Sequence, residues 1–179
     1  MRDSGSSMRP ALALALSLAA AGLAACAGTA TPTEQPSFYQ SLAQPNAVLD
    51  ANAAASMISG YRANNGLPAV AVDPQLMQLA ETQARAMAAR NKVDQNLGGA
   101  FTVRLRRAGY QAKTAAENVS AGYHTLAEAF SGWRDSPPHR ANMLLKGATK
   151  MGIAAVFAPG SKYKVFWSLI VAEPDDRRG

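Results

Sequence analysis

The stretch that most constrains the fold is YKVFWSLIV, residues 163–171, because it is apolar on both of its faces. Successive side chains of a strand point to opposite faces. Tyr163 and every second residue after it therefore share one face, while Phe166 and Ile170 lie on the other. Such a strand is expected inside a sheet that is covered on both sides.

Two further runs have the character of strands. Residues 151–158, MGIAAVFA, precede the first segment across a turn at Pro159-Gly160-Ser161, so the two runs are expected to form a hairpin. Residues 114–120, TAAENVS, are a third candidate strand.

Helical signals fill the chain before this hairpin. An apolar stripe predicts an amphipathic helix over residues 50–64, ended by Asn64-Asn65-Gly66. Asp73 is a good N-cap and Pro74 fits the first helical position, so a second helix is expected to run to about residue 91. Residues 101–108 predict a shorter helix.

Two more helices are expected after the third candidate strand. Thr125 and Glu128 have the spacing of a capping box, and they open a helix whose apolar stripe includes Trp133. Ser136-Pro137 starts another helical turn, which places His139 near free backbone N–H groups. Helices first and a hairpin last predict an α+β domain with antiparallel strands.

The first 49 residues divide into two segments that we expect to lie outside the fold. Residues 1–25 combine a basic lead with an apolar run over 11–22 of signal-peptide length, and Met8 is an alternative start. Residues 26–49 are rich in Thr, Pro, Gln, Ala and Ser and are expected to form a flexible tether. The folded domain is then expected over residues 50–179.

Leu23-Ala24-Ala25-Cys26 resembles the bacterial lipobox, in which the cysteine becomes the lipidated first residue. Cys26 is the chain's one cysteine, so an intrachain disulfide is excluded. A free reactive thiol is the alternative, but the signal-like context favours lipidation. We therefore expect an exported lipoprotein whose membrane partner is reached through an anchor on Cys26. In a Gram-negative cell, Ala27 in place of Asp favours the periplasmic face of the outer membrane.

The formal net charge is +6, but the chain has no run of five like charges. Lys and Arg are spread along the sequence, which argues against a nucleic-acid-binding surface. The chain also lacks a Gly-rich phosphate loop, a GxSxG elbow, an HExxH motif and a zinc-type cysteine cluster.

The polar residues that remain as candidates for chemistry are Glu117, Asn118, His124, His139 and Asn142. Each has a structural alternative. Glu117 lies in a small, apolar stretch, and hydrogen-bonding carboxylates outnumber catalytic ones. His139 can stabilise a helix start, His124 fits an exposed turn, and Trp133 fits the core.

Residues 116–144, AENVSAGYHTLAEAFSGWRDSPPHRANML, resemble the signature region of bacterial CAP-domain proteins. This superfamily contains cysteine-rich secretory proteins, antigen 5 and plant pathogenesis-related 1 proteins. The resemblance extends over about residues 50–172, and it implies an α-β-α sandwich with a small antiparallel sheet between helices.

The resemblance also implies a cleft. Glu117 matches the family's Glu-Asn glutamate and His139 its second histidine, and some members bind a divalent metal with such residues. The stretch that should hold the first histidine, residues 88–99, contains none, and Asp94 is the nearest substitute. Ser136 replaces the further acidic residue. Glu117 and His139 alone are too few for a zinc site, so Asp94 or His124 would have to complete any metal site.

These observations favour a non-enzymatic binding module for a lipid, peptide or cell-wall ligand at the cell envelope. One alternative is a hydrolase that uses Glu117 as its base with His139 as its partner. Another is a structural lipoprotein that contacts a protein partner. In all three we expect Glu117 and His139 to be coupled, which would raise the pKa of the histidine.

Overall fold

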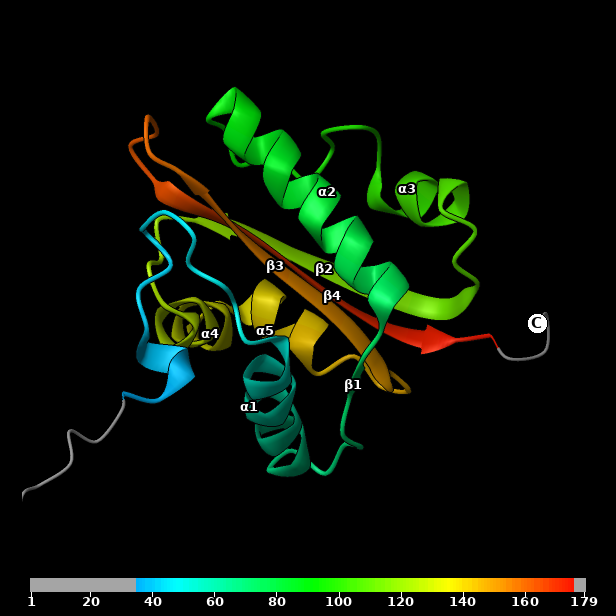
Figure 1. The fold of residues 1–179 in the computed structure, drawn as a ribbon. Coiled ribbons are helices and arrows are strands. Elements are labelled where there is room, and N and C mark those ends of the chain that lie inside the picture. Colours follow the sequence, from blue (N-terminus) through cyan, green and yellow to red (C-terminus); the bar gives the residue numbers. More distant parts are fainter. Residues whose placement is uncertain (1–34, 176–179) are drawn as a thin grey trace, which may run out of the picture. The chain divides into compact units, whose positions relative to one another are not determined.

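The computed structural model of the protein describes residues 35–175 and is built around a four-stranded sheet in the order β1-β3-β4-β2 (Figure 1). The strands are β1 (Ala71–Val72), β2 (Ala112–Ala121), β3 (Lys150–Ala158) and β4 (Lys164–Pro174). β4 pairs antiparallel with both β3 and β2. The expected hairpin and third strand are therefore confirmed.

The segment that is apolar on both faces lies in the interior of the sheet, as expected. On one face of β4, Val165, Trp167, Leu169 and Val171 belong to the larger core cluster. On the opposite face, Ile170 packs with Leu76, Ala80 and Ala84 in a second cluster. The mixed α+β fold with covering layers on both faces of the sheet is confirmed.

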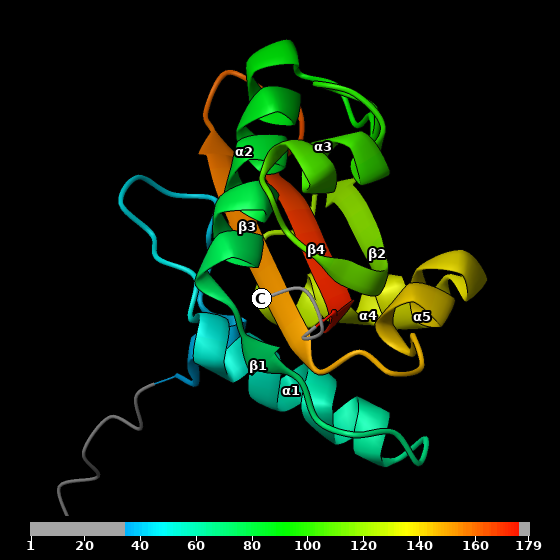
Figure 2. The same ribbon diagram turned by 90° about the vertical axis from the view of Figure 1, so that its right-hand side faces the viewer.

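Five α-helices and one short 3-10 helix accompany the sheet within the described residues. They are η1 (Ser37–Tyr39), α1 (Ala51–Ala63), α2 (Pro74–Arg90), α3 (Phe101–Arg107), α4 (Leu126–Asp135) and α5 (Pro137–Met143). α2 and α3 cover one face of the sheet, and α1, α4 and α5 lie on the other (Figures 1 and 2). No helix within residues 35–175 is long and apolar enough to cross a membrane.

The predicted helix starts are formed by side-chain caps. Asp50 accepts a hydrogen bond from the backbone N–H of Ala53, and Asp73 accepts from those of Gln75 and Leu76. Thr125 and Glu128 form the expected reciprocal capping box. These bonds satisfy N–H groups that the first turn of a helix leaves free, so the helix boundaries follow from local chemistry.

The α2 layer lies very close to the sheet at Gly152. A Cβ atom at this position of β3 would overlap the backbone of Leu76. Glycine is therefore required here because only a residue without a side chain allows α2 to approach β3 so closely. This close contact fixes the distance between α2 and the sheet, and therefore also the position of the α2–α3 connection.

Two features differ from the sequence-based expectations. β1 was not predicted, and it pairs with β3 in parallel, so the sheet is mixed rather than purely antiparallel. The folded part also begins before residue 50, because Leu42 is buried and its N–H donates to the carbonyl of His124 at 2.7 Å. Part of the expected tether, residues 35–49, thus packs on the domain. Residues 1–34, with the expected signal peptide and Cys26, lie outside the described residues.

Trp133 of α4 is a core residue with 1% of its surface exposed. Its ring meets that of Trp167 edge to face at 6.1 Å, and its Nε1 donates to Ser120 Oγ at 3.1 Å. We predict that Trp133→Ala lowers the free energy of unfolding by about 3–5 kcal/mol, because it leaves a large cavity. Urea denaturation measures this change.

The matched control is Val48→Ala, because Val48 is 84% exposed. This truncation should change stability by less than about 0.5 kcal/mol. Equal small effects of both substitutions would show that Trp133 is exposed in solution and available to stack on a ligand.

Candidate functional site

The carboxylate of Glu117 is buried under the α2–α3 face of the sheet, and Arg104 neutralises it. Arg104 Nη2 lies 2.5 Å from Glu117 Oε2, and Nη1 lies 3.2 Å from Oε1. Ser168 Oγ on β4 donates a third hydrogen bond to Oε1 at 3.1 Å. The side chains of Arg104 and Glu117 are 8% and 0% exposed. This is a bidentate, charge-assisted pair, and both carboxylate oxygens are occupied.

Arg104 also binds the connection between α2 and α3. Its Nη2 donates to the carbonyl of Gln95 at 3.1 Å, and its Nε donates to the carbonyl of Gly99 at 3.2 Å. The guanidinium lies over the ring of Phe101, 5.4 Å from the centroid. One buried cation therefore holds the connection, α3 and β2 together.

Side-chain amides bind the outer edge of β2 next to this pair. Asn142 Nδ2 donates to the backbone carbonyl of Glu117 at 3.1 Å and to Asn118 Oδ1 at 2.9 Å. Asn118 Nδ2 donates to the backbone carbonyl of His139 at 3.0 Å, and Gln95 Nε2 donates to the carbonyl of Glu117. These bonds attach α5 and the α2–α3 connection to β2, which has no further strand on this side within residues 35–175.

The expected coupling of Glu117 with His139 is not found. No hydrogen bond or ion pair joins the two side chains among the described residues, because the carboxylate faces Arg104 while the carbonyl of His139 is held by Asn118. The expected rise of the pKa of His139 is also wrong. Partial burial lowers the pKa of His139 below its ordinary value of 6.5, because a less polar surrounding disfavours the imidazolium.

The two other cleft candidates have local roles. Asp94 accepts hydrogen bonds from Lys92 Nζ at 2.9 Å and from the N–H of Asn96, and these bonds lower the pKa of its partly exposed carboxyl. His124 is exposed, and its N–H donates to Glu128 Oε2 at 2.6 Å in the α4 cap. Among residues 35–175, no group of three His, Cys, Asp or Glu side chains is placed to hold a metal ion.

Arg104 and Ser168 complete the Glu117 cluster, and sequence reasoning missed both. A signal for Arg104 is present, since it lies three residues after Phe101, next to Leu105, on the face of α3 that turns inward. A charged residue on a buried helical face requires a partner. Nothing in the sequence distinguishes Ser168 from other small residues of a buried strand.

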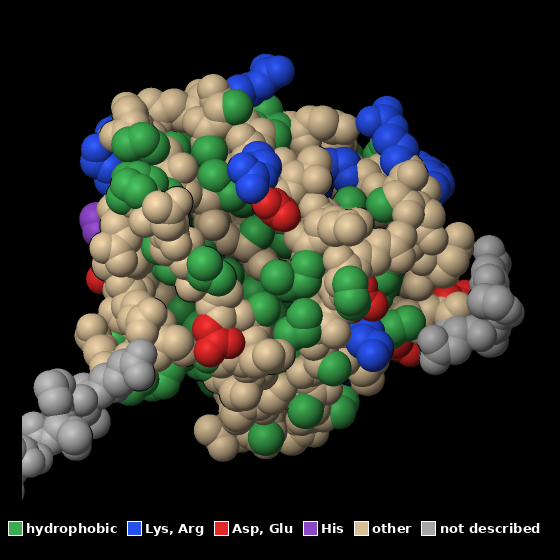
Figure 3. All heavy atoms as spheres, viewed as in Figure 1, with side chains coloured by type: hydrophobic (Ala, Val, Ile, Leu, Met, Phe, Trp, Pro, Cys, Tyr) green, Lys and Arg blue, Asp and Glu red, His purple; other side chains and the backbone are tan. Residues whose placement is uncertain are grey.

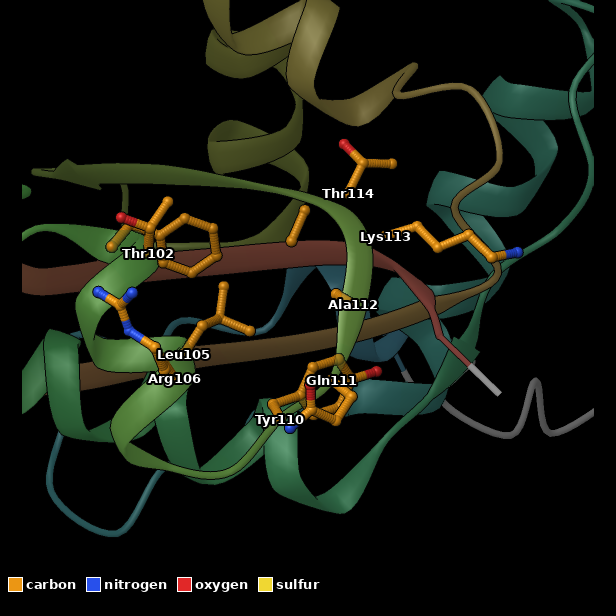
Figure 4. Close-up of a pocket in the computed structure, with 10 residues that line it drawn as sticks. Thr102, Leu105, Arg106, Tyr110, Gln111, Ala112, Lys113 and Thr114 are labelled. Carbon is orange, nitrogen blue, oxygen red and sulfur yellow. The ribbon is translucent and has the colours of Figure 1, made fainter. Parts of the chain in front are cut away.

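An open pocket of about 420 Å³ lies between α3 and the start of β2 (Figure 4). Phe101, Leu105 and Tyr110 form one side, and Ala112 and Ala115 of β2 form the other. The polar residues around it are Thr102, Arg106, Gln111, Lys113 and Thr114, so no acidic residue lines this pocket. Figure 4 shows Lys113 extending away from the other labelled side chains.

The buried pair generates a stability prediction. Glu117→Gln should lower the free energy of unfolding by about 3–5 kcal/mol, because it leaves Arg104 buried without a counter-charge. The exposed pair of Glu81 and Arg85 provides the control. Glu81→Gln should cost at most about 1 kcal/mol. Equal effects of the two substitutions, measured by urea denaturation, would contradict the burial of Glu117.

The lowered pKa of His139 predicts the sign of its pH dependence. The folded protein binds a proton at this site less readily than the unfolded chain does. The His139 contribution to stability is therefore fully present above the unfolded pKa and is lost as pH falls through the lower folded pKa. An NMR titration of the His139 ring should give a midpoint below 6.5. A midpoint above that value would contradict the lowered pKa and would indicate that a carboxylate lies next to the His139 ring.

Comparisons with known proteins agree with this architecture. One relative is an uncharacterized protein from Bacillus subtilis, 28% identical over 103 residues that cover 56% of this chain and 40% of the relative. The match thus spans less than half of that relative's length. An extracellular SCP-domain protein from Bacillus anthracis has a similar structure, with a TM-score of 0.59 at 23% identity over 68% of this chain and 39% of that one.

An outer surface protein from Borrelia burgdorferi superposes with a TM-score of 0.62 at 16% identity, over 70% of this chain and 92% of that chain. These structural likenesses show the fold alone. Residues 55–171 match the family described as CAP, the cysteine-rich secretory protein family. The match covers well over half of the chain; it contains the whole stretch from β1 to β3, with the helices α2 to α5, and most of β4. The chain therefore belongs to the CAP, or cysteine-rich secretory protein, family.

Proposed function

We propose that the protein is a binding module of the cell envelope, anchored through Cys26, and that its ligand is an amphiphile with an apolar body and an anionic group. The observation that carries this proposal is the pocket between α3 and β2. A volume of about 420 Å³ is within the range of small-ligand sites.

The lining of the pocket supports an apolar ligand body. Phe101 and Tyr110 provide aromatic surface, and Leu105, Ala112 and Ala115 provide aliphatic surface. Burial of apolar ligand surface against such side chains contributes roughly 25 cal/mol per Å². Lipid chains and the apolar parts of peptides meet this requirement.

The charges around the pocket support an anionic group on the ligand. The last turn of α3 carries Arg104, Arg106 and Arg107. Arg104 is used by Glu117 and Arg107 donates to the carbonyl of Gly98, whereas no ion pair engages the exposed Arg106 side chain within residues 35–175. Figure 3 shows Lys and Arg side chains gathered over the α3 end of this face.

The geometry of Glu117 favours binding over hydrolysis. A general base needs a free oxygen within hydrogen-bonding reach of the proton that it removes. Both oxygens of Glu117 already accept hydrogen bonds in a buried site.

Envelope anchoring rests on the order of the N-terminal segments: basic lead, apolar run, small residues and Cys26. The relatives described above as extracellular and outer surface proteins are in keeping with export. We predict that Cys26 is acylated. A clickable fatty-acid analogue should label the wild type and not Cys26→Ala, which should also leave the membrane fraction. Equal labelling and equal membrane retention of both proteins would exclude this anchor.

Ligand binding is tested with dodecyl phosphate below its micellar concentration, with dodecanol as the uncharged counterpart. Loss of a charge-assisted hydrogen bond costs about 1.5–3 kcal/mol, so Arg106→Gln should weaken dodecyl phosphate binding at least roughly tenfold. It should leave dodecanol binding unchanged. Isothermal titration calorimetry measures both affinities.

Lys146→Gln removes the same charge from an exposed position outside the pocket. This control should keep the wild-type affinity for dodecyl phosphate. If both substitutions weakened dodecyl phosphate binding equally, the loss of affinity would come from the change in net charge and not from a contact with Arg106. Failure of the wild type to bind either amphiphile would reject the pocket as a lipid-type site.

A further inference from the structure

The segment from residue 35 to residue 61, which contains η1 and most of α1, is almost without charge. Asp50 is its one charged residue, although 17% of the whole chain is Asp, Glu, Lys or Arg. The Asp50 carboxylate accepts hydrogen bonds from Ser37 Oγ at 3.0 Å and from the N–H of Ala53 at 2.9 Å. This one charge is therefore held at the N-terminus of α1, where the helix stabilises it.

An apolar hollow opens in this segment, between η1 and the first turns of α1. Figures 1 and 2 both show η1 beside the start of α1. The volume of the hollow is about 610 Å³, and its lining residues are Pro36, Ser37, Phe38, Ala53, Ser56 and Met57. Only the two serines among them have polar side chains, and the hydroxyl of Ser37 is bound to Asp50. The hollow thus presents apolar surface without a charged group in its lining.

Large apolar side chains are exposed next to the hollow. Tyr39 is 53% exposed, and its ring lies 4.6 Å from that of Phe38 between centroids. Val48 is 84% exposed and lies two residues before Asp50, which binds Ser37 of η1. Single exposed apolar residues are common on protein surfaces. An apolar hollow flanked by exposed apolar side chains, within a segment of one charge, is instead typical of an interaction site.

The place of this surface along the chain keeps it close to a membrane, if Cys26 is the anchor that we propose above. Nine residues separate Cys26 from Pro36, the first residue of the hollow's lining. An extended chain spans at most about 3.6 Å per residue, so an anchored membrane is never more than about 36 Å away along the chain. A short link of this kind gives the second contact a high effective concentration.

We propose that the η1 surface, formed by residues 36–39 with Val48 and Met57, docks on the bilayer in which Cys26 is anchored. The ring of Tyr39 has the amphipathic character that is typical of the membrane–water interface. The contact is with the apolar boundary of the bilayer and not with lipid charge, because residues 35–61 contain no Lys or Arg. This inference rests on the proposed anchor but not on the ligand of the α3–β2 pocket.

Docking would also orient the domain. α1 and α3 cover opposite faces of the sheet (Figures 1 and 2). A bilayer that contacts η1 and the start of α1 therefore leaves α3 on the side that faces away from it. The α3–β2 pocket and the exposed Arg106 would then be open to the aqueous compartment.

The test places the fluorophore NBD beside the η1 surface of the full-length, acylated protein in phosphatidylcholine nanodiscs, which leave both membrane faces open to solvent. Gln40→Cys is labelled next to Tyr39, and Ala89→Cys, at an exposed position of α2, is the matched control. Cys26 is the chain's one native cysteine, so its acylation leaves a single thiol to label. NBD at residue 40 should emit at shorter wavelength, and dithionite should reduce it several-fold more slowly than at residue 89.

Equal reduction at the two positions, in protein that co-elutes with the nanodiscs, would overturn the docking and leave the anchor intact. Failure to co-elute would reject the anchor, and the docking with it. Addition of phosphatidylglycerol should not increase the protection of residue 40. Protection that appears only with this anionic lipid would contradict an apolar contact.

A matched pair of substitutions tests the surface itself. Val48→Asp should remove the protection of residue 40, because a carboxylate resists transfer out of water. Val93→Asp introduces the same charge at an exposed valine of the α2–α3 connection and should keep the protection. Both variants should unfold at the wild-type temperature, since both side chains are exposed. Protection that survives Val48→Asp, or that both substitutions remove equally, would contradict the proposal.

Discussion

The architecture depends on one buried ion pair. Arg104 and Glu117 lie almost wholly out of contact with water, and each is the counter-charge that the other requires. Through carbonyl and hydroxyl bonds the pair also fixes Gln95, Gly99 and Ser168. The α2–α3 connection, α3, β2 and β4 thus share one electrostatic centre, and Phe101, which contacts Arg104, also lines the pocket between α3 and β2.

On the other face of the sheet, Arg62 is a second buried arginine that binds backbone carbonyls. Its guanidinium is fully buried, and it donates to the backbone carbonyls of Pro68, Met143, Leu145 and Ala148. Burial without a carboxylate lowers its pKa. The carbonyl of Met143 at the end of α5, which no backbone N–H of the helix can reach, thereby gains a donor. Both buried guanidinium groups bind backbone carbonyls of loops, whereas Arg106 is exposed, and our proposal assigns the ligand contact to it.

Local chemistry explains why much of the fold could be predicted. Asp50, Asp73 and the Thr125–Glu128 box cap helices through bonds that span two or three residues, and the apolar pattern of β4 follows from its central place. β1 could not be predicted, because two residues carry no periodicity. The partner of Glu117 could not be predicted either, since FTVRLRR offers three arginines and the choice depends on which one turns inward. The motif positions of Glu117 and His139 indicated the fold correctly and their coupling wrongly.

A double-mutant cycle in unfolding free energy tests the role of Glu117 most directly. The cycle combines Glu117→Gln with Arg104→Met and, separately, with His139→Gln. Residues in one buried network couple by about 0.5–3 kcal/mol, whereas independent sites add within about 0.3–0.5 kcal/mol. A large coupling energy with Arg104 and additivity with His139 are predicted. Strong coupling of Glu117 to His139, with additivity toward Arg104, would contradict the role of Glu117 as the counter-charge of Arg104. It would instead support an acid–base pair of Glu117 and His139.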